Sequence, residues 1–255
     1  MKPKALVLQA HGSNRDFDVI EALTLAGADA TGVPLNELRS NKALFSDFQL
    51  LVIPGGFSYA DALGAGKLLA LDLTSYFEEE ISAFVDSGKP VLGICNGFQA
   101  LVKSGILPGN HEGATLTFNA QGHFVCRWVT LQPVSQKCIW TNGLTEMIEC
   151  PVAHGEGNFQ TGEHFPLSTF AFHDQIALTY VCQDGSPAHS EYPTNPNGSV
   201  LDIAGICNSQ GNVLGLMPHP ENHIHPYQHP QRTRGINRRS GLALFKNGVK
   251  YASQI

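Results

Sequence analysis

Charged side chains are scarce in this chain of 255 residues. Asp, Glu, Lys and Arg together make up 15% of it, whereas hydrophobic residues make up 42%. A chain with this balance can bury a full core, which excludes an intrinsically disordered protein. The net charge is −6, and arginines cluster only in the short stretch Arg232–Arg239. Without a larger basic patch we expect no nucleic-acid partner.

Metal-binding cysteine pairs and long apolar segments are also missing. The six cysteines are scattered and none forms a C-x-x-C pair, so a disulfide framework or zinc knuckle is disfavoured. Apolar runs such as Leu50–Pro54 are far shorter than the roughly 20 residues of a membrane-spanning helix. The stretch Met1–Gly12 lacks the hydrophobic region of a secretory signal. We expect a cytoplasmic protein with no membrane partner.

Strand-like and helix-like segments alternate through the first hundred residues. The expected elements are strand Ala5–Gln9, helix Phe17–Ala26, strand Ala28–Val33, strand Phe48–Pro54, helix Tyr76–Asp86 and strand Pro90–Ile94. This alternation predicts an α/β fold with a doubly wound, mostly parallel sheet, which binds ligands at the carboxyl ends of its strands. We therefore expect the chemistry in the loops His11–Asn14 and Pro54–Tyr59 and in the turn at Cys95.

After about Gly113 the pattern changes to short strand-like runs broken by Gly, Pro and Asn, which predicts an antiparallel extension of the sheet. The expected elements are strands Ala114–Asn119 and Phe124–Leu131, a hairpin of Ile203–Cys207 and Val213–Met217, and a closing helix Leu242–Tyr251. There is no internal repeat or long linker, so we expect one domain over residues 1–255.

Cys95 stands at a sharp break between a strand and a helix. The strand Pro90–Ile94 ends in the turn Gly93–Gly97, and apolar residues at helical spacing follow. This pattern is typical of a nucleophile elbow, in which a strained turn raises the reactive atom above the sheet edge. Glycines suit unusual backbone angles and leave room beneath the turn, and the helix dipole favours a thiolate. This turn alone fits a reactive nucleophile and a small buried cysteine equally well.

The segment Met217–Glu221 supplies a candidate base. Two prolines flank His219 and favour an extended backbone, in which residues two apart project to the same side. We therefore expect His219 and Glu221 to point together, as a cysteine nucleophile requires of its base and of the carboxylate that orients it. The alternative is a rigid turn with a surface histidine, which the Cys95 elbow disfavours.

A thiolate that attacks a carbonyl also needs donors for the resulting oxyanion. One donor of an elbow is the backbone N–H of the residue after the nucleophile, here Asn96, and a second comes from a neighbouring loop. The loop after the third strand is suited to this because glycine lets the backbone approach a substrate. We expect Gly56 and Phe57 to line the oxyanion hole, although a plain tight turn would need the same glycines.

Several motifs together resemble class I, triad-type, glutamine amidotransferases. G-I-C-N-G-F-Q fits their G-x-C-x-G-x-Q signature, and H-P-E fits their distal His-x-Glu pair. More narrowly, almost the whole chain is similar to the glutaminase subunits of phosphoribosylformylglycinamidine synthase. The motifs are PGGFSYAD (54–61), GKPVLGICNGFQ (88–99), AHGEGNF (153–159), NPNGS (195–199), AGICN (204–208) and MPHPE (217–221). Other amidotransferases of the class lack the combination of PGGFSY and HGEG.

The resemblance implies a flavodoxin-like fold and a mechanism. Cys95 would be the nucleophile, His219 the general base and later acid, and Glu221 the residue that orients His219. Cys95 would attack the side-chain amide of glutamine, ammonia would leave with a proton from His219, and water would release glutamate.

The resemblance also implies substrate contacts and shows two departures. Gln99 would hold glutamine, and His154 with Glu156 would line its pocket. Asn222 stands where many relatives have arginine, and Ala60 where glycine is usual. Neither position belongs to the triad.

Partners follow from the same resemblance. Ammonia would pass to a synthetase subunit that uses ATP to amidate formylglycinamide ribonucleotide in purine biosynthesis, and a small accessory subunit can belong to the complex. The chain has no G-x-x-x-x-G-K-S/T stretch, so we expect ATP and Mg²⁺ in the partner and no cofactor here.

Other interpretations stay open from the sequence. A stand-alone cysteine hydrolase of the same fold, cleaving γ-glutamyl or peptide bonds, would use the same triad, but PGGFSY and HGEG argue against it. A non-catalytic module would be expected to lack a triad residue. His223, His225 and His229 crowd the segment after the triad glutamate. Since they lack cysteine or further carboxylate ligands, we expect a solvated loop or partner surface and no metal site.

Overall fold

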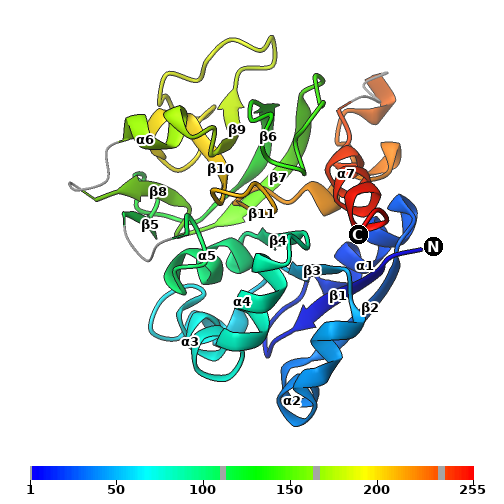
Figure 1. The fold of residues 1–255 in the computed structure, drawn as a ribbon. Helices are drawn as coiled ribbons and strands as arrows, with labels where there is room; N and C mark the ends of the chain where they lie inside the picture. The colour runs from blue at the N-terminus through cyan, green and yellow to red at the C-terminus, as the bar shows by residue number, and fades with distance from the viewer. Residues whose placement is uncertain (1, 110–112, 163–166, 235–238) are drawn as a thin grey trace.

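The computed structural model describes residues 2–109, 113–162, 167–234 and 239–255. A nine-stranded sheet runs through the molecule in the order β2-β1-β3-β4-β11-β10-β9-β6-β7, and β5 and β8 form a separate pair (Figure 1). The strands are β1 (Lys4–Gln9), β2 (Asp29–Pro34), β3 (Leu50–Ile53), β4 (Val91–Ile94), β5 (Ala114–Thr117), β6 (Val125–Pro133), β7 (Ile148–His154), β8 (Asn158–Thr161), β9 (Ile176–Val181), β10 (Ile203–Cys207) and β11 (Val213–Leu216).

One half of the sheet is parallel. β1 pairs with β2 and β3, β4 pairs with β3, and β11 pairs with β4, all in the parallel sense. The central strands are buried along their whole length, as in Leu50–Ile53, because helices cover both of their faces. Parallel strands end at one edge of the sheet, so the segments after β1, β3, β4 and β11 are brought together there.

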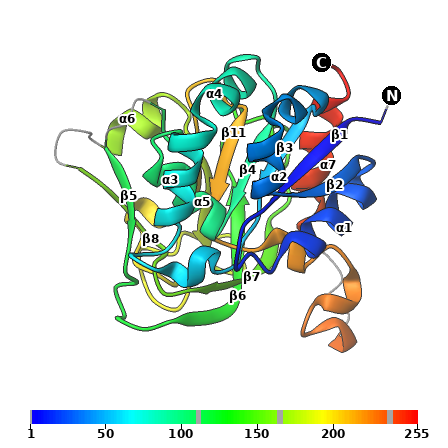
Figure 2. The ribbon, with the colours of Figure 1, turned by 90° about the horizontal axis from the view of Figure 1, so that it is seen from below.

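Helices form a layer on each side of this parallel half (Figures 1 and 2). α1 and α7 pack against each other on one side, while α3 and α5 pack together on the other. The helices are α1 (Asp16–Ala26), α2 (Leu35–Ser40), α3 (Lys67–Tyr76), α4 (Glu78–Asp86), α5 (Asn96–Lys103), α6 (Leu167–Phe172) and α7 (Leu242–Ala252). Within the described ranges, no helix has the length and apolar character needed to cross a membrane.

The predicted fold class is confirmed, with corrections at individual elements. β6, β7, β9 and β10 form the expected antiparallel extension, and β10 and β11 form the expected hairpin. β5 does not join this extension, because it pairs with β8 alone. The helix expected over Tyr76–Asp86 begins at Glu78, since the fully buried Phe77 has φ −127° and separates it from α3.

Candidate active site

Cys95 lies between β4 and α5 in a strained backbone conformation. Its φ of 50° and ψ of −103° are unfavourable for a residue with a side chain, as expected of a nucleophile elbow. Neither Gly93 nor Gly97 has a positive φ, so the unusual angles belong to the cysteine itself. Gly97 is required for another reason: a Cβ there would lie 2.0 Å from the carbonyl oxygen of Ile53.

His219 and Glu221 lie beside Cys95, as expected. The Nδ1 atom of His219 is 2.6 Å from Oε1 of Glu221, and both side chains are buried. The backbone N–H of His219 donates to the carbonyl of Pro151 at 2.8 Å, which anchors the histidine to β7. A Cβ at Gly55 would lie 2.6 Å from His219 Cε1 and 3.4 Å from Cys95 Cβ, so the backbone of this glycine borders both side chains.

Charge inside the site favours a protonated histidine. Burial alone lowers the pKa of His219, but the charges of Glu221 and Cys95 and hydrogen bonds to both side chains raise it to about 10. A charged imidazole at this position can hold the proton that acid–base chemistry beside a cysteine nucleophile requires.

The expected reason for the His219–Glu221 contact is wrong, although the contact exists. Residues Pro220–Asn222 form a single 3₁₀ turn and do not form an extended segment. His219 stands just before this turn with φ −108° and ψ 81°. The glutamate therefore reaches the ring of the histidine because the backbone turns, and not because alternate residues of an extended strand share a side.

Of the three expected oxyanion donors, two have no hydrogen-bond partner within the described ranges. The backbone N–H of Phe57 donates to the carbonyl of Gly12 at 3.0 Å, so Phe57 is not available as a donor and this prediction is wrong. Among the described residues, no partner lies on the N–H of Gly56, nor on that of Asn96 in the first turn of α5. Gly56 has φ 137°, and a Cβ there would lie 2.7 Å from the backbone nitrogen of Asn14. Only glycine fits this close approach between the two loops.

Gln99 and Glu156 are brought together behind the elbow. Nε2 of Gln99 donates to the carbonyl oxygen of Glu156 at 2.6 Å. The Glu156 carboxylate accepts a hydrogen bond from the N–H of Ala65 at 3.2 Å and lies 3.5 Å from Nζ of Lys103. The predicted substrate loop after β7 is therefore tied to α5 and to the loop after β3.

His154 is held by a residue that the sequence analysis missed. Its Nδ1 atom is 3.1 Å from Oδ1 of Asn119, whose Nδ2 donates to the carbonyl of His154 and whose Oδ1 also accepts from the N–H of Gly157. Burial lowers the pKa of His154 to about 3, with a smaller effect of the charge on His219, so the ring is neutral. Asn119 is the last residue of the expected strand 114–119. It belongs to no motif, so no local pattern in the sequence indicates its role.

Comparisons with known proteins identify the family of this chain. Residues 2–252 match the family model of the CobB/CobQ-like glutamine amidotransferase domain. The chain belongs to this glutamine amidotransferase family. It is 52% identical over 268 residues to the phosphoribosylformylglycinamidine synthase subunit PurQ of Treponema denticola, covering 98% of this chain and 99% of that protein. The protein of that name from Dehalococcoides mccartyi is 40% identical over 261 residues, covering 100% and 99%.

Solved structures of amidotransferases show the same fold. A chain in the structure of PurLQS from Thermotoga maritima matches with a TM-score of 0.76 and 32% identity, covering 98% of this chain and 99% of that one. A glutamine amidotransferase of the same organism has a TM-score of 0.55 at 14% identity with full coverage of both chains, which shows the fold alone. The resemblance inferred from the motifs is thus confirmed.

The two departures from the family pattern lie in loops around the amidotransferase site. Nδ2 of Asn222 donates to Oδ2 of Asp18 at 3.2 Å, which joins the turn after His219 to α1. Ala60 is exposed and has φ 55° and ψ 29°, in the left-handed region that favours the glycine usual at this position.

Replacing Ala60 with glycine is expected to stabilise the protein by about 1 kcal/mol, because an alanine in the left-handed region costs more than the extra chain entropy of glycine. Urea unfolding should show a higher midpoint with an unchanged m value. Ala62, also exposed but with φ −55°, is the matched control, and Ala62→Gly should lower the midpoint. A lower midpoint for Ala60→Gly would contradict the expectation.

Two of the three histidines that follow Glu221 lie together, His223 and His229, with ring centroids 5.2 Å apart, and His225 stands apart from them. His223 and His229 are buried against the ring of Trp128, so the expected solvated loop is wrong for them, while His225 forms an outer pair with Glu21 at 2.8 Å. Nε2 of His229 lies 3.0 Å from the Glu149 carboxylate. The part of the chain that the structure describes holds no cluster of three or more side chains able to bind a metal.

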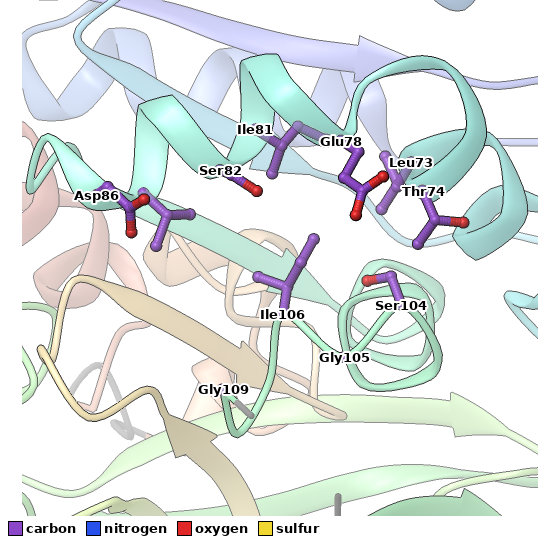
Figure 3. A pocket seen from close by; sticks show the side chains of 11 residues that line it. Leu73, Thr74, Glu78, Ile81, Ser82, Asp86, Ser104, Gly105, Ile106 and Gly109 are labelled. Atoms are coloured by element: carbon purple, nitrogen blue, oxygen red, sulfur yellow. The ribbon is translucent and has the colours of Figure 1, made fainter. Parts of the chain in front are cut away.

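Two cavities beside α3 differ in their relation to the amidotransferase site. The first, of about 200 Å³, lies between α3, α4 and the C-terminal end of α5, with Glu78 and Ser104 in its wall (Figure 3). It lies at the opposite end of α5 from Cys95. The second, of about 770 Å³, is bordered by Lys103 and Glu156 and therefore adjoins the predicted substrate loop.

Proposed function

We propose that this chain hydrolyses the side-chain amide of glutamine at Cys95. The proposal rests above all on one observation: His219 lies beside a cysteine that stands in an elbow, and Nδ1 of this histidine is held at 2.6 Å by the buried Glu221. The nucleophile thus lies next to the base, and the base next to the carboxylate that orients it, as acyl transfer through a covalent intermediate requires.

The sulfur of Cys95 attacks the amide carbon of glutamine, and the carbonyl electron pair moves to the oxygen. The N–H groups of Gly56 and Asn96 donate to this oxyanion. As the carbon–nitrogen bond breaks, His219 donates its proton to the nitrogen and ammonia leaves a thioester. His219 then takes a proton from water, which attacks the thioester, releases glutamate and restores the thiolate.

The family specifies the physiological role. As a member of the PurQ family, the chain is the glutaminase subunit of phosphoribosylformylglycinamidine synthase and acts in purine biosynthesis. Relatives of nearly equal length carry this name, which disfavours a stand-alone cysteine hydrolase. We propose that ammonia passes to a cytoplasmic synthetase subunit that holds ATP and Mg²⁺, with a small accessory subunit in the complex and no cofactor in this chain.

Glutaminase activity of the isolated chain is expected to be weak and to rise at least about tenfold when the synthetase subunit and its nucleotide substrates are added. The reason is that Gly56 lies on an irregular loop, and a misplaced oxyanion donor costs about two to three decades in turnover. Steady-state glutamate release measures the effect, with Cys95→Ala as the background control. Full activity alone, together with no binding to the synthetase, would favour a stand-alone hydrolase.

A further inference from the structure

The side chain of Asn96, the residue after Cys95, is 2% exposed and makes four hydrogen bonds. Its Oδ1 accepts from the backbone N–H of Ser58 at 3.2 Å and from the Ser58 hydroxyl. Its Nδ2 donates to Oδ1 of Asp61 at 3.0 Å and to Oε1 of Gln99 at 3.1 Å. A primary amide has two donor hydrogens and two acceptor lone pairs, so the full capacity of this side chain is used.

These four bonds join three segments of the site. Ser58 and Asp61 belong to the loop after β3 that carries Gly56. Gln99 lies one turn further along α5 and donates to the carbonyl of Glu156 in the loop after β7. Asn96 therefore links the loop after β3 to the first turn of α5. Through Gln99, it also links both of them to the predicted substrate loop after β7.

The loop held by Asn96 has an unfavourable backbone. Tyr59, Ala60 and Asp61 have φ values of 54°, 55° and 53°. Each non-glycine residue in the left-handed region costs on the order of 1 kcal/mol, and such strain persists only where surrounding contacts hold it. On its outer side the loop is held by Tyr59, whose hydroxyl donates to Asp72. On the side of the nucleophile it is held by Asn96.

We propose that Asn96 is a positioning residue: its side chain fixes the loop after β3 and thereby holds the Gly56 N–H in position relative to Cys95. The backbone N–H of Asn96 is the other expected donor, so a single residue couples both halves of the oxyanion hole. This inference rests on the proposed function of Cys95. Because oxyanion contacts form in the transition state, loss of the coupling lowers kcat more than it raises KM.

Asn96→Asp is the sharpest test because it keeps the shape and replaces the donor nitrogen with an acceptor oxygen. The introduced carboxylate faces the acceptor oxygens of Asp61 and Gln99, with Glu156 and Lys103 as the other nearby charged groups. In the complex with the synthetase subunit, kcat is expected to fall about 10- to 100-fold at pH 8. The deficit should shrink at pH 6, because protonation of the introduced carboxyl restores a donor.

A reciprocal variant and a matched control separate positioning from general damage. Asn96→Asp combined with Asp61→Asn places a donor opposite an acceptor again, and should recover at least about threefold in kcat at pH 8. Asn208→Asp is the control, since Asn208 is also buried and hydrogen-bonded, to Asn212 at 2.9 Å and to Val213 at 3.1 Å, in the β10–β11 hairpin. It should lower stability and leave the pH profile of kcat unchanged.

Wild-type kcat in Asn96→Asp, or an equal deficit at both pH values and in the double variant, would overturn the positioning role. Failure of the proposed function gives a different result, because glutaminase activity would then survive Cys95→Ala. The alkylation rate of Cys95 in each variant shows whether the introduced charge acts on the sulfur directly; a deficit explained wholly by slower alkylation would also overturn the proposal.

Discussion

Replacing Cys95 with alanine is expected to lower glutamine hydrolysis in the complex by about four decades or more. Without the sulfur no thioester forms, and only direct attack of water on an unreactive amide remains. Steady-state glutamate release measures the loss, and amidation supplied with free ammonia should persist because the synthetase is untouched. Undiminished glutaminase activity in Cys95→Ser would exclude the assignment.

Chemical labelling provides an independent check on Cys95. One equivalent of an electrophilic glutamine analogue should label it in preference to Cys126, although Cys95 is 4% exposed and Cys126 is exposed. If the buried cysteine is labelled before the exposed one, the reagent must bind as the substrate does and the sulfur must be an activated thiolate. A small electrophile that does not resemble glutamine is the control and should also reach Cys126. Even labelling of the cysteines by the glutamine analogue would contradict the prediction.

Replacing His219 with alanine is expected to cost on the order of three decades or more in kcat, and Glu221→Ala fewer. The histidine moves the proton in both half-reactions, whereas the carboxylate orients the ring and helps to raise its pKa to about 10. Without Glu221, Cys95 still favours the charged ring, so part of the function remains. Single-turnover glutamate release from each variant in the complex measures the two losses.

The molecule offers a matched control for this pair. His229 and Glu149 form a second buried histidine–glutamate contact, at 3.0 Å, and the chemistry assigned to Cys95 does not involve them. His229→Ala removes a similar pair and should lower stability with little change in kcat. Equal, mild losses in His219→Ala and His229→Ala would mean that the turn after β11 is only structural.

Local patterns predicted the parallel core well because each strand there is a short apolar run that is buried on both faces. β1, β3, β4 and β11 begin and end within a few residues of the expected bounds. The helix break at Phe77 was missed, since a buried aromatic residue continues a helical pattern and its φ depends on what it packs against. The pairing of β5 with β8 was missed because a strand pattern does not specify its partner.

For the residues of the site, too, local patterns predicted some features and missed others. The motifs predicted a triad of Cys95, His219 and Glu221, and the structure brings these three side chains together, while their catalytic roles stay predictions. The motifs could not show that the Phe57 N–H is already donated to Gly12, nor that Asn119 holds His154. Both facts depend on contacts between segments that are distant in the chain.

The sequence by itself determined the family, the α/β class and the elbow at Cys95, because each of these features can be recognised from short runs of neighbouring residues. Only the tertiary structure decided which backbone N–H groups stay free for an oxyanion and which side chain holds their loop in place. A hydrogen bond such as that from Ser58 to Asn96 forms only after β3 and β4 lie side by side in the sheet, so no local pattern encodes it.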